Sequence, residues 1–314
     1  MSALDTNALA VIFPGQGSQE PNMGRDLAES SPEAMELWKK AERISGVSLR
    51  EIYWDGDATA MAETRYLQPA LTVVNVSFWA HLASKLSPLG VAGHSLGEFS
   101  ALAASQVLPV DDILELVCLR GRLMSEADPE GRGKMAAVLK LTQEQSEDVV
   151  ARVREQSGKE LLIANYNSPA QFVLSGDAQA VDAAGPAVKE LGGRLIPLPV
   201  SGAFHSPLMA EAASELAGVM KKLSWNKAKY PVFLNVTGRP ESDADVLRDT
   251  LCRQMTSSVQ WIETIRSQWA AGARNWIEVG PKTVLAKLLS FILKDQEEGW
   301  TGTSIGSLEG AGKL

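Results

Sequence analysis

The sequence Gly-His-Ser-Leu-Gly at 93–97 constrains the fold more than any other segment of the chain. A short apolar run at 90–92 precedes it, and residues 98–107 follow it without glycine or proline, as where a strand turns sharply into a helix. Glycines on both sides of Ser95 allow a tight turn that presents the hydroxyl group outside the sheet. We interpret Ser95 as a candidate nucleophile; the alternative is a turn with a purely structural role.

The composition narrows the class of protein. The chain has 314 residues, 45% hydrophobic and 22% charged, which is typical of a soluble globular protein. No apolar run reaches the roughly 18 residues of a membrane span, so no membrane partner is expected. The net charge of −8, with both signs interspersed, leaves no basic stripe for nucleic acid. Met1–Asn7 lacks the regions of a signal peptide, and Cys118 and Cys252 stand alone, so we expect a cytoplasmic protein with reduced cysteines.

Short apolar runs alternate with longer helical patterns, which predicts an α/β fold with a mainly parallel sheet. Leu9–Phe13 reads as a buried strand and is followed by a loop rich in helix breakers. Further strands are expected at 232–236 and 275–279, and helices at 31–44, 69–86, 110–127, after His205, and at 244–255, 259–271 and 283–293. The tail 299–314 is rich in glycine and serine, and we expect it to be mobile.

One segment departs from this alternation. Strands at 135–139, 161–166, 172–175 and 194–198 and helices at 142–157 and 178–191 follow the order β-α-β-β-α-β, the ferredoxin-like pattern. We therefore predict an α/β-hydrolase-like domain formed by residues 1–132 and 200–314, into which a ferredoxin-like subdomain at 133–199 is inserted.

A serine nucleophile needs a base within hydrogen-bond reach, and the chain has three histidines. His94 adjoins Ser95 on a sharp turn, where neighbouring side chains diverge, and His81 lies in a helical pattern. His205 lies in a loop before a helix, where sites of α/β sheets assemble, so its position favours it as the base. The acid that would orient it is not evident; Asp111 and Asp243 are equal candidates.

Several motifs occur together in one order. They are Pro14-Gly15-Gln16-Gly17-Ser18-Gln19, Gly93-His94-Ser95-Leu96-Gly97-Glu98, Leu119-Arg120-Gly121-Arg122-Leu123-Met124, Asn165-Tyr166-Asn167-Ser168-Pro169, Gly202-Ala203-Phe204-His205 and Glu278-Val279-Gly280-Pro281. From residue 9 to about 294 the chain resembles the malonyl-CoA:acyl carrier protein transacylases, whose fold also serves as the acyltransferase domain of polyketide and animal-type fatty acid synthases. That family also has the inserted ferredoxin-like subdomain.

The resemblance implies a role for each matching residue. Ser95 matches the acylated nucleophile and His205 the general base, whose imidazole is held in this family by backbone groups rather than by a carboxylate. Gln16 and Leu96 match the positions whose backbone N–H groups form the oxyanion hole. Arg120 matches the arginine that binds the malonyl carboxylate through two parallel hydrogen bonds; without the resemblance it reads as a surface arginine.

The remaining candidates bear on the substrate pocket. In the polyketide branch, a phenylalanine just before the base accompanies malonyl and a serine accompanies methylmalonyl, so Phe204 indicates malonyl. Leu96 in the elbow, rather than glutamine, indicates the same. Gln68, Asn167 and Gln260 match positions lining the cleft, and each is otherwise an ordinary polar residue. Phe99 departs from the family's usual tyrosine.

The expected function is transfer of malonyl from malonyl-CoA to the phosphopantetheine thiol of acyl carrier protein, supplying extender units for fatty acid synthesis. The catalytic residues alone do not distinguish this from a polyketide pathway. The resemblance implies no metal and no bound cofactor, and a monomer. Basic residues near the cleft would dock the acidic carrier, and the candidates are Lys189, Arg194, Lys282 and Lys287. A serine hydrolase and a non-catalytic scaffold are the alternatives.

Overall fold

The computed structural model describes residues 8–56, 58–200, 202–296 and 299–313. The segment 1–7, on which the expectation about a signal peptide depends, lies outside these ranges. No helix within them has the length and apolar character needed to cross a bilayer.

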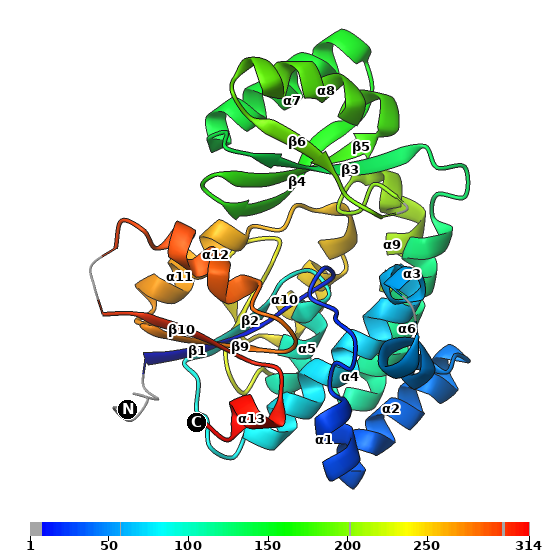
Figure 1. The fold of residues 1–314 in the computed structure, drawn as a ribbon, viewed down its shortest axis with the longest axis vertical. Coiled ribbons are helices and arrows are strands. Elements are labelled where there is room, and N and C mark those ends of the chain that lie inside the picture. The colour runs from blue at the N-terminus through cyan, green and yellow to red at the C-terminus, as the bar shows by residue number, and fades with distance from the viewer. Residues whose placement is uncertain (1–7, 57, 201, 297–298, 314) are drawn as a thin grey trace.

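Six strands form the larger sheet, which is parallel except at one edge (Figure 1). In spatial order they are β10 (Thr301–Ile305), β9 (Asn275–Val279), β1 (Leu9–Phe13), β2 (Gly90–Gly93), β7 (Val232–Phe233) and β8 (Pro240–Glu241). Among the strand pairs of this sheet in the described ranges, only β7–β8 is antiparallel. Every residue of β1 and β2 is buried, as expected of central strands covered on both faces. The prediction of a mainly parallel α/β sheet is confirmed.

Helices cover both faces of this sheet, and further helices pack against those (Figure 1). The helices of the larger domain are α1 (Arg25–Ser30), α2 (Pro32–Ser45), α3 (Ala58–Ala62), α4 (Thr64–Leu82), α5 (Gly97–Ala104), α6 (Val110–Glu126), α9 (Ala210–Met220), α10 (Ala244–Leu251), α11 (Trp261–Ala270), α12 (Leu285–Ile292) and α13 (Leu308–Ala311). A π-helical turn spans Glu51–Asp55, and 3₁₀ turns span Pro207–Met209 and Gln254–Thr256. Ser31 caps α2 with Pro32 at its first position, as predicted. The predicted start of α4 was wrong, because Pro69 lies inside that helix.

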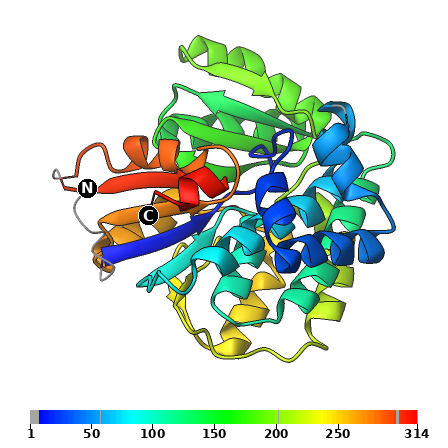
Figure 2. The same cartoon turned by 60° about the horizontal axis from the view of Figure 1, so that its bottom comes forward.

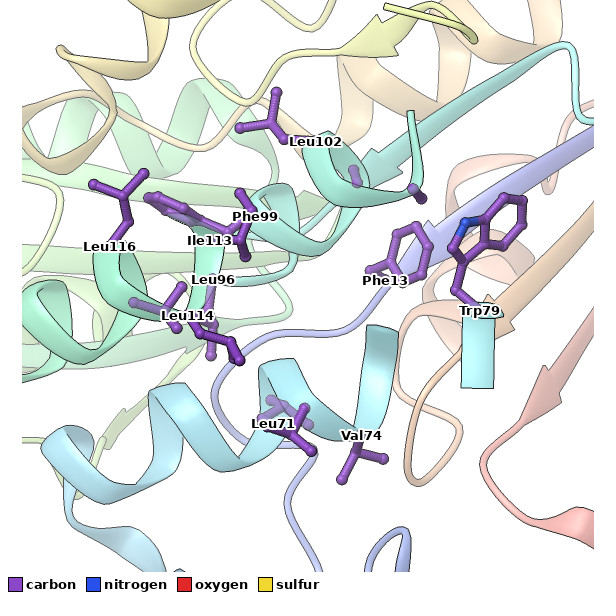
Figure 3. Close-up of a cluster of buried hydrophobic side chains, with 14 of the residues drawn as sticks. Phe13, Leu71, Val74, Trp79, Leu96, Phe99, Leu102, Ile113, Leu114 and Leu116 are labelled. Carbon is purple, nitrogen blue, oxygen red and sulfur yellow. The ribbon is translucent and has the colours of Figure 1, made fainter. Parts of the chain in front are cut away.

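The helix that follows the Ser95 turn is packed on several sides (Figure 3). Phe99 and Leu102 of α5 are fully buried, together with Ile113 and Leu114 of α6 and Phe13 of β1. These side chains belong to one core cluster that also contains Leu71 and Val74 of α4. A dense core of this kind holds the turn before α5 in a fixed position.

The second sheet is entirely antiparallel and has the predicted ferredoxin-like order. Its strands lie in the order β4 (Leu161–Ser168), β5 (Gln171–Asp177), β3 (Gly133–Leu139) and β6 (Arg194–Pro197). Helices α7 (Gln143–Ser157) and α8 (Ala178–Glu190) cover its face away from the larger sheet in both views (Figures 1 and 2). The other face looks toward the larger sheet.

The two sheets are joined by backbone as well as by the connecting segments. The Tyr166 N–H donates to the Val259 carbonyl at 3.0 Å, and the Val259 N–H donates to the Ala164 carbonyl at 2.8 Å. This short parallel bridge attaches the edge of β4 to the segment before α11. The domain boundaries at 132/133 and 199/200 stay a prediction.

The expectation of a mobile tail was wrong. Residues Thr301–Ile305 form β10, which pairs in parallel register with β9 and closes one edge of the larger sheet. Ile305 is only 3% exposed, and the Leu308 N–H donates to the Asp26 carboxylate at 2.7 Å. The glycines and serines give this segment a low β-propensity, so its sequence did not indicate a strand. The strand is stabilised by its pairing with β9 instead.

Candidate active site

The backbone around Ser95 shows why glycine occupies both flanking positions. A Cβ atom on Gly93 would lie 1.9 Å from the Gly97 carbonyl carbon, and one on Gly97 would lie 2.1 Å from the Phe13 carbonyl oxygen. Ser95 itself has a φ of 50°, a left-handed conformation that is uncommon for a residue with a side chain. This strained turn between β2 and α5 is the nucleophile-elbow geometry that the sequence predicts.

Ser95 and His205 meet although 110 residues separate them in the chain. The Ser95 Oγ lies 2.8 Å from His205 Nε2. On the other side of the ring, Nδ1 lies 3.1 Å from the Gln254 carbonyl oxygen and 3.0 Å from that of Ser257. Carbonyl oxygens only accept hydrogen bonds, so Nδ1 carries the proton and Nε2 is free to accept the one from Ser95.

No carboxylate orients His205 in the described part of the chain, and both guesses at such an acid were wrong. Asp111 forms an ion pair with Lys40 at the surface. Asp243 caps α10 by accepting from the Asp245 and Val246 N–H groups. The two carbonyl oxygens hold the imidazole instead, as the resemblance implied.

The surroundings of His205 keep it neutral. Burial, together with the nearby charge of Arg120, lowers the pKa of His205 from 6.5 to about 3. The loop that carries it is fixed from the small sheet, since the Ser175 hydroxyl donates to the Phe204 carbonyl at 2.7 Å. The ring is therefore a neutral acceptor held at hydrogen-bond distance from the serine hydroxyl.

Arg120 extends from α6 into the same site and is 1% exposed. Its Nη2 donates to Ser95 Oγ at 3.2 Å and to Gln254 Oε1 at 3.1 Å, while Nη1 donates to Gln68 Oε1 at 2.9 Å. Among the described residues its hydrogen-bond partners are the Gln68, Gln254 and Ser95 oxygens rather than a carboxylate, and its Nε has no partner. Burial lowers the pKa of Arg120 to about 10, which leaves it charged at neutral pH. Glu98 is the carboxylate whose charge acts on it, without direct contact, so the guanidinium is suited to an anionic ligand.

Leu96 begins the turn into α5, and Gln16 lies in the loop after β1. In the part of the chain that the structure describes, neither backbone N–H donates to an acceptor of the protein. The start of α5 adds the positive end of a helix dipole beside Leu96. These two N–H groups are available to a developing oxyanion.

The side chains enclose a pocket of about 100 Å³. Its lining includes Gln16, Ser95, Leu96, Arg120, Phe204 and His205. A cleft of about 480 Å³ adjoins it and shares Gln16, His94, Asn165 and Leu198 with it. Asn167 lines this cleft, where its Oδ1 lies 2.7 Å from His94 Nε2. The His94 ring also packs against Trp261, so these two contacts support the turn and direct the ring away from the role of base.

Two further predicted residues lie outside these linings. Gln68 is buried behind Arg120 and accepts its hydrogen bond. Gln260 lies before α11, where its N–H donates to the Asn235 carbonyl at 2.8 Å. Gln68 is therefore placed to support the arginine, and Gln260 the loop that carries Asn235.

The sequence reasoning missed Gln254 and Asn235 altogether. The Asn235 side chain accepts from the Ser95 N–H at 2.6 Å and donates to the Gly93 carbonyl at 2.6 Å, so it ties both sides of the elbow together. Gln254 donates to the Ser95 carbonyl at 2.9 Å and also meets Arg120 and His205. Neither residue lies in a motif, and only the fold brings them to the elbow. Glu98, which lies within the elbow motif, accepts from both.

The arrangement supports nucleophilic acyl chemistry. It combines a serine hydroxyl, a neutral base, two free N–H groups and a buried cation within one pocket. No group of His, Cys, Asp and Glu side chains in the described ranges is arranged to hold a metal ion.

Comparison with known proteins places the chain among relatives of known class. Residues 11–313 match the model of the acyl transferase domain. The malonyl CoA-acyl carrier protein transacylase of Escherichia coli strain K12 is 38% identical over 290 residues, covering 90% of this chain and 92% of that protein. The protein of the same name from Bacillus subtilis strain 168 is 38% identical over 283 residues, covering 90% and 89%.

Solved structures agree with these relatives. An acyl carrier protein S-malonyltransferase from Vibrio cholerae superposes with a TM-score of 0.91 at 36% identity, covering 98% of this chain and 99% of that one. A malonyl-transacylase solved in complex with its type II PKS acyl-carrier protein gives 0.90 at 34% identity, with 97% of each chain covered. The chain therefore belongs to the acyl transferase family.

Proposed function

We propose that this protein is a malonyl-CoA:acyl carrier protein S-malonyltransferase that supplies extender units for fatty acid synthesis. The observation that carries the proposal is Arg120, a buried cation whose Nη2 lies 3.2 Å from the Ser95 hydroxyl. Acyl transfer to a serine needs no such cation, whereas an acyl group that ends in a carboxylate does. The relatives named above as malonyl transacylases support this substrate.

The first half-reaction forms a malonyl-serine ester. His205 Nε2 accepts the Ser95 proton as Oγ attacks the thioester carbonyl of malonyl-CoA, and the Gln16 and Leu96 N–H groups stabilise the oxyanion. The tetrahedral intermediate then expels coenzyme A, whose sulfur takes the proton from His205. Each oxyanion-hole donor is expected to contribute roughly 3–4 kcal/mol to transition-state stabilisation.

The second half-reaction repeats these steps with a different thiol. The phosphopantetheine thiol of acyl carrier protein gives its proton to His205 and attacks the ester carbonyl. Collapse of the intermediate breaks the bond to Oγ, and His205 returns the proton to Ser95. Throughout both steps the Arg120 guanidinium holds the malonyl carboxylate through two parallel hydrogen bonds.

The pocket also favours malonyl over its α-methyl derivative. Phe204 is 4% exposed and lines the pocket next to His205. Its ring occupies the space into which an α-methyl group would project, as the polyketide-branch pattern implies. Asn167 lines the cleft next to this pocket, and Gln68 supports Arg120 by accepting its hydrogen bond. Gln260 acts only through the loop of Asn235.

We further propose a cytoplasmic monomer that needs neither metal nor bound cofactor. Its substrates then diffuse to the cleft beside Ser95. The docking surface for the acidic carrier lies at the cleft that Lys287 lines. Lys282 lies in the segment before α12 and is exposed.

The test is the intact mass of the protein after mixing with malonyl-CoA, followed by peptide mapping. A single malonyl adduct on Ser95, absent from Ser95→Ala and discharged by acyl carrier protein faster than by water, is the expected result. Release of free malonate at the same rate without carrier would favour a hydrolase. Absence of any adduct would favour a non-catalytic scaffold.

A further inference from the structure

A buried carboxylate lies behind the nucleophile turn and takes no part in the chemical steps described above. Glu98, in the first turn of α5, is 1% exposed. Its Oε1 accepts from the Asn235 N–H at 2.8 Å, and its Oε2 accepts from Gln254 Nε2 at 2.6 Å. Burying a carboxylate is costly unless its oxygens are hydrogen-bonded, so these two contacts hold it in a defined orientation.

The contact with Gln254 fixes which way that amide points. Gln254 Nε2 donates to the Glu98 carboxylate and also to the Ser95 carbonyl at 2.9 Å. The ionised Glu98 carboxylate and the Ser95 carbonyl have no proton to donate, so only the NH₂ end of the amide fits against them. The other end, Oε1, then faces Arg120 Nη2 at 3.1 Å.

The orientation of Arg120 depends on two amide oxygens. Gln68 Oε1 accepts from Nη1, and Gln254 Oε1 accepts from Nη2, the same nitrogen that reaches Ser95 Oγ. The guanidinium also lies over the Phe99 ring at 5.5 Å, next to Glu98 in sequence. If the Gln254 amide turned over, its NH₂ group would face Nη2, donor against donor, and this support would be lost.

We propose that Glu98 is a positioning residue for acyl-group recognition, which holds Arg120 in its carboxylate-binding orientation through the Gln254 amide. This inference rests on the proposed function, because it takes the malonyl carboxylate as the ligand of Arg120. Glu98 touches neither the substrate nor the reacting atoms; it sets the direction of the hydrogen-bond chain that ends at the guanidinium.

The test reverses the direction of the hydrogen bonds that link Glu98, Gln254 and Arg120. In Glu98→Gln the new amide keeps its shape, and its oxygen still accepts from the Asn235 N–H. Its NH₂ group then faces Gln254, which must turn over to accept and so presents a donor to Arg120. We expect the ratio of malonyl to acetyl transfer, each as kcat/KM, to fall about 10- to 100-fold.

Glu278→Gln is the matched control. Glu278 is another fully buried carboxylate of the larger domain, and its hydrogen-bond partners among the described residues are backbone N–H groups at the start of α12. The same substitution there can lower the melting temperature but leaves the malonyl-to-acetyl ratio unchanged. An equal fall in both variants would mean that loss of a buried carboxylate acts through stability, and it would overturn the proposal.

A double-mutant cycle tests the route through Gln254. Gln254→Met removes the amide, keeps the side-chain length and retains the carbonyl that holds His205. If Glu98 acts through this amide, Glu98→Gln changes the ratio less than about twofold in the Gln254→Met background. If the fall of the ratio in the double variant equals the product of the falls in the two single variants, Glu98 does not act through Gln254, and this route is overturned. If Glu98→Gln alone is too unstable to purify, Gln254→Met must still lower the ratio by itself, and the pH dependence of the ratio in the wild-type protein tests Glu98.

The pH dependence gives a readout that a structural role would not move. Burial raises the pKa of Glu98 to about 7, and the charged group that opposes this rise is Arg120 from α6; His205, across the site, is neutral. A protonated Glu98 presents a donor to Gln254, as Glu98→Gln does. The wild-type malonyl-to-acetyl ratio should therefore fall as pH drops through about 7, and Glu98→Gln should show no such step; a step that persists in the variant would contradict the assignment.

The proposal and the proposed function fail in different ways. If the wild-type protein forms no malonyl adduct on Ser95, the function itself fails. If Arg120→Ala abolishes malonyl selectivity and Glu98→Gln preserves it, the function stands and the role of Glu98 is overturned. If Arg120→Ala and Glu98→Gln both lose malonyl selectivity while Glu278→Gln keeps it, the hydrogen-bond chain from Glu98 to Arg120 is supported.

Discussion

Arg120 Nη2 donates to Ser95 Oγ at 3.2 Å, so the buried cation touches the nucleophile directly. Ser95 Oγ accepts this hydrogen bond and donates its own proton to His205 at 2.8 Å. A malonyl group bound as an ester to Oγ would therefore carry its free carboxylate beside the guanidinium. Selection of the acyl group and its activation take place at a single oxygen atom.

Arg120→Ala should invert the acyl preference. The malonyl carboxylate would enter a buried pocket without a partner, at a cost of about 2–5 kcal/mol. With about 1.4 kcal/mol for each factor of ten, kcat/KM for malonyl should fall by about 30-fold or more relative to acetyl. The measurement is the rate of Ser95 acylation by the two coenzyme A esters.

Arg122→Ala is the control for this change. Arg122 lies on the same helix, but it is half-exposed and forms ion pairs with Glu126 and Glu215. Its removal should leave the preference intact. If both variants keep the wild-type preference, another residue selects the acyl group.

The pH profile of acylation should reflect the lowered pKa of His205, which burial and the charge of Arg120 bring from 6.5 to about 3. A base whose pKa is depressed stays neutral until the pH approaches the lowered value, so the acid limb moves to lower pH. Acetyl-CoA is the substrate to use, because it lacks the carboxylate that Arg120 binds. We expect its acylation rate to hold between about pH 8 and pH 5.

Arg120→Ala provides a second arm for the same experiment. Removing the guanidinium removes the second largest of the three causes that lower the pKa of His205, so the acid limb should shift toward higher pH. A wild-type midpoint near 6.5 would show that the imidazole is not desolvated in the working enzyme.

Phe204→Ser should admit an α-methyl group. The serine removes the ring from the pocket lining, and selectivity worth about one methyl group, about 1–3 kcal/mol, should be lost. Acylation by methylmalonyl-CoA relative to malonyl-CoA should rise about tenfold or more. Leu208→Ser is the control, because Leu208 lies just beyond His205 but is 46% exposed. If the ratio of methylmalonyl to malonyl acylation is unchanged in Phe204→Ser, Phe204 does not exclude the α-methyl group.

Local signals predicted the elements that carry their own pattern. The apolar run Leu9–Phe13, the capped start of α2 and the β-α-β-β-α-β order of the small sheet each follow from residues close in sequence. The pairing of Ser95 with His205 was predicted in the same way, by choosing among three histidines on position.

What could not be predicted depends on contacts between distant segments. Asn235 and Gln254 reach the elbow from loops more than 100 residues away, and neither lies in a pattern that marks it. The backbone carbonyl groups that accept from His205 cannot be identified in a sequence, because every residue has one. Asp111 and Asp243 were suggested because a carboxylate is visible in a sequence and a carbonyl is not.

Strand β10, which was also not predicted from the sequence, gives a prediction about stability. Ile305→Ala should lower the free energy of unfolding by about 2–4 kcal/mol, because Ile305 is only 3% exposed at the end of the strand. Thr303→Ala, at an exposed position of the same strand, should change it by no more than about 0.5 kcal/mol. Equal effects in a denaturant titration would mean that the strand contributes little to the folded state.

Lys287 is the docking candidate that the cleft favours. It is exposed on α12 and lines the cleft that shares Gln16 and His94 with the catalytic pocket. Lys189 lies in the last turn of α8, on the face of the small sheet turned away from the larger sheet (Figure 1). Charge reversal at Lys287 should therefore weaken binding of an acidic carrier, and the same change at Lys189 should not.

The measurement must separate the carrier from coenzyme A, because both are anionic. The malonyl-Ser95 enzyme is formed first, and its discharge is then followed with acyl carrier protein or with free pantetheine. Lys287→Glu should slow discharge by the carrier about tenfold at low salt, with a smaller effect at high salt, and leave discharge by pantetheine unchanged. Lys189→Glu should leave both rates unchanged; a slower carrier reaction in that variant alone would move the docking surface to the small subdomain.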